Sequence, residues 1–123
     1  MIHEINSHDW RAFCQRITGQ CVGATVKLEV MGADGLKVEK IANATLQNME
    51  FDATDKCSDV ITLRLKSTRE IAHEIIEPVQ IKIHSPGTSG DFNLISIEAE
   101  SGTTIITLHP VIHAQMLEGL KIS

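Results

Sequence analysis

The sequence predicts an α+β protein with a mainly antiparallel sheet of six or seven strands, or a partly closed barrel. We expect an N-terminal helix and a short C-terminal helix at its ends. An apolar stripe with helical spacing lies near the N-terminus, alternating patterns typical of half-buried strands follow, and short turn sequences join them. No helical pattern separates the strands, so parallel crossovers are not expected. We interpret residues 1–123 as a single domain.

The predicted N-terminal helix begins near Ser7, a good N-cap residue, and Gly19 is a natural stop. Apolar side chains follow at helical spacing, at Trp10, Phe13, Cys14 and Ile17.

A period of two then replaces the helical period. The segments read as strands are 24–32, 36–41, 43–51, 59–67, 71–84, 93–100 and 103–109. The alternation slips near Gln47 and Asn48, which indicates a bulge. Pro110 suits the first position of a helix, and Val111, Met116 and Leu117 would form its apolar side. From the alternation and the helical stripe we expect a common core of Trp10, Phe13, Ile17, Val26, Leu28, Ile61, Leu63, Ile81, Ile83 and Ile97.

Composition and charge limit the function classes. The net charge is −5 and only 3% of the residues are aromatic, so we expect no nucleic-acid partner. The longest stretch without charged residues, 101–117, contains a proline and several polar residues, and we expect no membrane association. Three cysteines, Cys14, Cys21 and Cys57, form no C-x-x-C pair. With a polar N-terminus, they predict reduced thiols in the cytoplasm.

The stretch "AHEIIEPVQIKIHS" resembles a zinc motif in which Glu77 replaces the second histidine. Pro78 disfavours a helix at Glu77, and His73 and Glu77 would lie about 13 Å apart on a strand. We therefore interpret the stretch as one strand, or as two strands, 71–77 and 79–84, joined by a bend. His109 and His113 have no third ligand nearby, so we predict no metal and no cofactor.

Several segments together resemble a family of small bacterial proteins of unknown function, with similarity over about residues 3–109. They are Trp10 with Phe13, Val26 to Gly32, Asp59 to Leu65, His73 to Pro78, and Ile97 to Thr103. The resemblance implies no activity. It implies that the H-E-x-x-x-P segment belongs to the scaffold.

Two functional hypotheses follow. The first is a non-enzymatic cytoplasmic domain that binds a protein partner or forms a homodimer, because an open sheet must protect its edges. No catalytic motif such as G-x-S-x-G or a phosphate loop occurs. The second is an enzyme or a small-ligand-binding barrel whose polar groups come from separate strands. Its candidate residues are His73, Glu77, His84 and His109.

Overall fold

The computed structural model describes residues 2–53, 59–85, 91–113, 115 and 119–120. The elements in chain order are β1 (Ile2–Ile5), a short 3-10 helix (Ser7–Asp9), α1 (Trp10–Cys21), β2 (Thr25–Gly32), β3 (Lys37–Ala53), β4 (Asp59–Lys66), β5 (Glu70–Ile76), β6 (Pro78–His84), β7 (Phe92–Ala99) and β8 (Gly102–Ile112).

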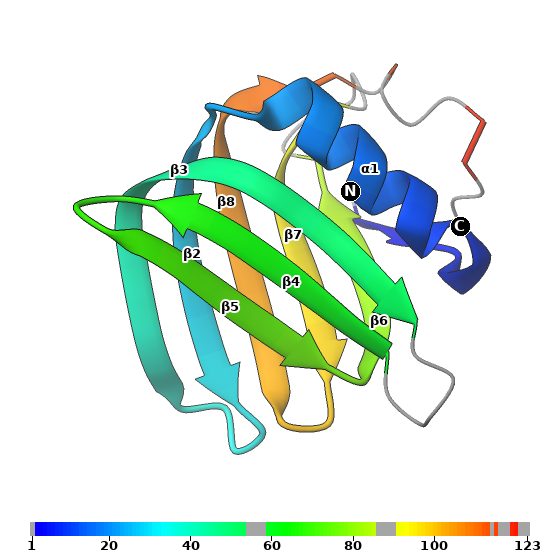
Figure 1. Cartoon of the computed structure of the whole chain (residues 1–123). Helices are drawn as coiled ribbons and strands as arrows, with labels where there is room; N and C mark the ends of the chain where they lie inside the picture. The colour runs from blue at the N-terminus through cyan, green and yellow to red at the C-terminus, as the bar shows by residue number, and fades with distance from the viewer. Residues whose placement is uncertain (1, 54–58, 86–90, 114, 116–118, 121–123) are drawn as a thin grey trace.

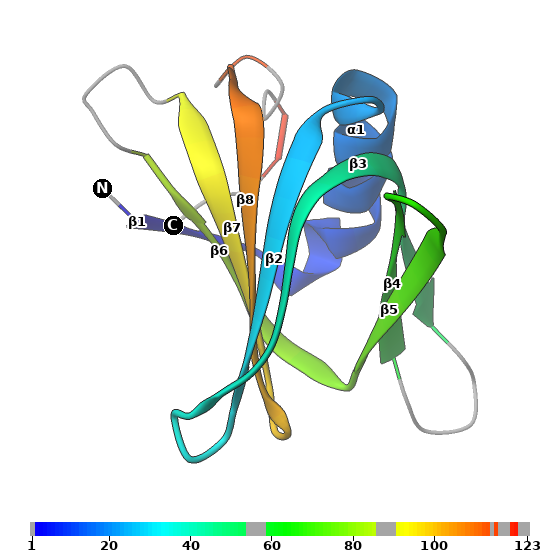
Figure 2. The ribbon, with the colours of Figure 1, turned by 90° about the vertical axis from the view of Figure 1, so that its left-hand side faces the viewer.

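Within the described residues, one antiparallel sheet contains eight strands in the order β1-β6-β7-β8-β2-β3-β4-β5, and it is not closed. The long strand β3 pairs with β2 through its first half and with β4 through its second half. It bends strongly between these halves, so β4 and β5 fold over the other strands as a second layer (Figures 1 and 2). Helix α1 packs against β3 at one end of the space between the layers.

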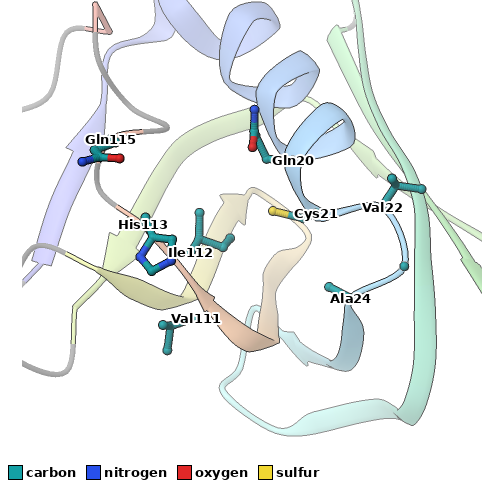
Figure 3. A pocket seen from close by; sticks show the side chains of 9 residues that line it. Gln20, Cys21, Val22, Ala24, Val111, Ile112, His113 and Gln115 are labelled. Carbon is teal, nitrogen blue, oxygen red and sulfur yellow. The ribbon is translucent and has the colours of Figure 1, made fainter.

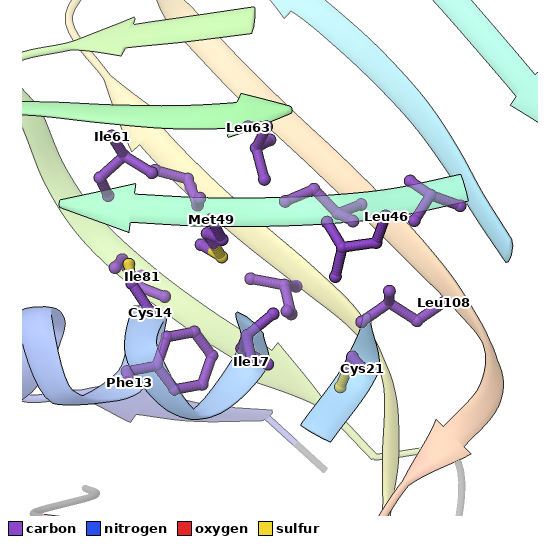
Figure 4. Close-up of a cluster of buried hydrophobic side chains, with 14 of the residues drawn as sticks. Phe13, Cys14, Ile17, Cys21, Leu46, Met49, Ile61, Leu63, Ile81 and Leu108 are labelled. Carbon is purple, nitrogen blue, oxygen red and sulfur yellow. The ribbon is translucent and has the colours of Figure 1, made fainter. Parts of the chain in front are cut away.

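The core lies between the two layers and α1 (Figure 4). The ten residues that the sequence patterns placed in the core are all buried: Trp10, Phe13, Ile17, Val26, Leu28, Ile61, Leu63, Ile81, Ile83 and Ile97. The helical stripe and the strand alternation are therefore confirmed. The predicted bulge is confirmed too, because the register between β3 and β4 shifts between Leu46 and Asn48.

The predicted helix is confirmed, but its ends differ. Ser7 lies in the 3-10 turn, and α1 continues through Gly19 to Cys21. The chain then turns at Gly23, which has a φ of 90°. Glycine weakens a helix without having to end it, and the apolar stripe here extends to the buried Cys21.

The predicted C-terminal helix is wrong where the structure describes it. Val111 and Ile112 belong to β8, and Ile112 pairs with Phe92 of β7. Met116 and Leu117 lie outside the described residues. In the described part of the chain, α1 is the only α-helix.

The predicted strand count of six or seven is also wrong, because β1 adds a strand at the edge next to β6.

Stretch 71–84 forms two strands with a bend, as one of the two interpretations predicted. Glu77 makes this bend with a φ of 54°, and its N–H donates to the Asp59 carbonyl at 2.8 Å. The bend connects β5, at one end of the strand order, to β6 near the other end. Directly after the bend, the β6–β7 register shifts between Pro78 and Gln80, and Val79 at this irregularity is exposed.

Candidate functional site

His73 lies on the inner face of β5, between the two layers. Its Nε2 forms a hydrogen bond of 3.2 Å with Oγ1 of the buried Thr104 on β8. The flanking residues Glu70, Ala72, Glu74 and Ile76 are exposed, as alternation on a strand requires. The hydrogen bond between His73 and Thr104 therefore connects the two layers inside the fold.

The other three candidate residues lie elsewhere. His84 is on the outer face of β6, opposite the side of the buried Ile81 and Ile83, and its Nε2 is 3.3 Å from Ser96 Oγ. Burial first and the Lys82 ammonium second lower the pKa of His84. His109 is exposed near the end of β8, where it pairs with Thr25, and the exposed Glu77 occupies the bend. The structure does not gather the four candidates into one site.

Metal ligands and reactive thiols are the next kinds of site to consider in the described segments. There, no three His, Cys, Asp or Glu side chains are grouped so that they could hold a metal ion. Burial raises the pKa of Cys14 to about 12, against a smaller opposing effect of Arg11, and burial also raises the pKa of Cys21. Both thiols are therefore poor nucleophiles at neutral pH. Cys57 lies outside the described residues.

A pocket lies between the end of α1 and the end of β8 (Figure 3). Its volume is about 570 Å³, and Gln20, Cys21, Val22, Ile112 and His113 are among its lining residues. Sequence patterns did not reveal it, because no motif joins these two distant segments. The one local signal is Val22, an apolar residue that belongs neither to the helical stripe nor to the next alternating strand.

The outer edge of β5 is the second candidate site. In the part of the chain that the structure describes, β5 pairs with β4 and with no other strand. The N–H of Glu77 donates to the Asp59 carbonyl, and the N–H of Ser67 donates to the Arg69 carbonyl. Both residue pairs continue the register of the β4–β5 pairing. Because hydrogen-bonded pairs alternate in antiparallel strands, odd-numbered residues of β5 face β4. The backbone groups of Glu70, Ala72, Glu74 and Ile76 therefore point to the open edge.

The described segments contain no helix with the length and apolar character needed to cross a membrane. No curated protein and no solved structure matches the chain. A family model described as "Family of unknown function" matches residues 1–114, somewhat more than the region of resemblance expected from the sequence motifs. The chain belongs to this family of unknown function, DUF5335.

Proposed function

We propose that this protein is a non-enzymatic interaction module of the cytoplasm that forms a homodimer through the open edge of β5. The observation that carries the proposal is the row of outward-pointing backbone groups on β5. A second strand can satisfy these groups by strand addition, and a second copy of the same edge is always available for twofold pairing. The described cysteines, Cys14 and Cys21, are unpaired, which supports a reducing compartment.

The charge pattern of β5 favours one register. A twofold axis at His73 overlaps the whole strand and places Glu70 opposite Ile76 of the second copy. Ala72 then lies opposite Glu74 of the second copy. An axis at Ala72 would place Glu70 opposite Glu74, and an axis at Glu74 would oppose two copies of that carboxylate. Directly opposed like charges destabilise a strand pair, so the axis at His73 is favoured.

An exposed apolar side chain on the outer side of β5 supports the same surface. Ile76 is 56% exposed, although it is a large apolar residue. In the favoured register its side chain packs against the aliphatic part of Glu70 from the second copy. The interface is a single strand pair, so we expect a dimer that dissociates on dilution.

Light scattering over a concentration series tests the dimer. We expect the average mass to rise from one chain toward two as concentration increases. Ala72→Pro removes an outward N–H without removing a bond to β4, since proline is tolerated on the open side of an edge strand. This variant should remain monomeric. Ala72→Val keeps the N–H and serves as its matched control. A constant monomer mass for the parent chain contradicts the proposal.

A pair of substitutions at Ile76 tests the register. With the axis at His73, Ile76→Lys places an ammonium opposite Glu70 of the second copy, whereas Ile76→Glu places two carboxylates opposite each other. The lysine variant should therefore dimerise more tightly than the glutamate variant, and added salt should reduce the difference. Equal dissociation constants for the two variants at low salt would exclude this register.

A further inference from the structure

The pocket between α1 and β8 is separate from the β5 edge and has the features of a small-ligand site. Its volume of about 570 Å³ falls in the range usual for such sites. Cys21 and Ile112 line it and are each only 6% exposed. The pocket is therefore walled in part by side chains of the hydrophobic core.

Two exposed apolar side chains border the same pocket. Val22 is 62% exposed and Val111 is 41% exposed, and both line the cavity. Figure 3 shows that they come from the two elements that form it, Val22 from the turn after α1 and Val111 from β8. They lie on different sides of the pocket (Figure 3), and exposed apolar side chains at a cavity are typical of binding surfaces. A ligand with an apolar body would cover both.

The polar lining residues are Gln20, His113 and Gln115. The Nδ1 atom of His113 lies 3.4 Å from Asp91 Oδ2, so this contact involves one ring nitrogen and leaves Nε2 on the other side of the ring. Two amides and an imidazole offer both donors and acceptors. A hydroxyl or amide group on a ligand could use both kinds.

Two negative groups beside the pocket disfavour an anion. Helix α1 ends at Cys21, and the C-terminal end of a helix carries partial negative charge. The Asp91 carboxylate adds to this near His113. A carboxylate or phosphate would approach both groups unfavourably, whereas a neutral polar group would not.

From these features we propose that the pocket binds a small neutral molecule with an apolar body and one hydroxyl or amide end. The apolar body would lie against Cys21 and Ile112 and between Val22 and Val111. The polar end would lie among Gln20, His113 and Gln115.

Two probes with the same ring system test the site: 1-naphthalenemethanol, which is neutral, and 1-naphthoate, which is anionic. Titration into isotope-labelled protein, followed by amide chemical shifts, reports both affinity and location. We expect 1-naphthalenemethanol to shift the amides of residues 20–24 and 111–113, and to bind at least about fivefold more tightly than 1-naphthoate. Equal or tighter binding of the anion would overturn the proposal, as would shifts located elsewhere.

A matched pair of valine variants separates this pocket from general stickiness. Val22 and Val79 have similar exposure, 62% and 66%, but Val79 does not line the pocket. Val22→Asn should weaken binding of 1-naphthalenemethanol by about fivefold to tenfold because it removes apolar contact area. Val79→Asn should leave binding unchanged. Equal losses in the two variants would show nonspecific binding and refute the site. Neither variant alters the β5 edge, so the dimer proposal is tested independently.

Discussion

The hydroxyl of Thr18 on α1 bonds to the backbone of Met49 on β3. Thr18 Oγ1 lies 2.8 Å from the Met49 carbonyl oxygen and 2.9 Å from the Met49 nitrogen, whose N–H donates to it. Asn48 Oδ1 and the Cys14 carbonyl are further acceptors within reach of the single hydroxyl proton. Here β3 has passed the end of its pairing with β2, so the helix satisfies a strand edge that would otherwise be open.

Thr18→Val should lower the free energy of unfolding by about 1–3 kcal/mol, because the shape is kept while the Met49 N–H loses its acceptor. Urea denaturation measures the change. Thr18→Ser retains the hydroxyl and should lose less stability than Thr18→Val. A Thr18→Val variant that is no less stable than the Thr18→Ser variant would contradict the contribution of these hydrogen bonds.

Leu63→Ala should lower the free energy of unfolding by about 2–5 kcal/mol, since Leu63 is 1% exposed between the layers. The adjacent Arg64 is exposed on the other face of β4, so Arg64→Ala should change stability much less. A loss below about 1 kcal/mol for Leu63→Ala would contradict the burial of this face.

Burial in the core could be predicted from sequence because it depends on local periodicity. Ile61 and Leu63 alternate with polar neighbours on β4, and this alternation alone assigns their face. The bend was signalled by Pro78, because proline within a strand is confined to an edge, a start or a bulge, whereas the positive φ of Glu77 was not signalled. These predictions needed no knowledge of which strands pair.

The elements that were missed depend on distant partners. β1 has four residues and pairs with β6, nearly eighty positions later, so its short pattern carried little signal. Pro110 suggested a helix, but the last β2–β8 pair is Thr25 with His109, and the β7 register shifts between Phe92 and Leu94. A proline is tolerated in a strand where the regular ladder is interrupted.

The binding surfaces were also beyond local patterns. The separate strands that carry His73 and His84 direct the first side chain inward and the second outward. Strand order decides such convergence, and one sequence does not specify it. The pocket likewise joins the end of α1 to the end of β8.

Acidification should destabilise the protein in part through His84. Its pKa is lowered in the folded state, by burial first and by Lys82 second, so the unfolded chain binds more protons as pH falls below about 6.5. The folded state therefore has its full stability with respect to His84 above that pH, and it loses stability as pH falls through the folded-state pKa of His84. His84→Gln should show a smaller loss of unfolding free energy between pH 7.5 and pH 5 in urea denaturation.

An NMR titration of the His84 ring checks the cause. Lys82→Gln removes the nearby ammonium and should raise the pKa of His84, while the part due to burial remains. If the His84→Gln variant lost as much stability on acidification as the parent chain, another group would control the acid response.

Gly102 and Gly19 should respond in opposite directions to alanine. Gly102 opens β8 with a φ of +146°, and a Cβ there would collide with the Met31 carbonyl oxygen of the neighbouring strand β2. Backbone cannot move aside as a flexible side chain can, so Gly102→Ala should lower the free energy of unfolding by at least about 2 kcal/mol. Gly19 lies inside α1, and a Cβ there would meet nothing within 4 Å. Gly19→Ala should therefore raise the free energy of unfolding by about 0.5–1 kcal/mol. Urea denaturation of both variants measures the contrast, and a Gly102→Ala protein as stable as the parent would disprove the close approach of β8 to β2.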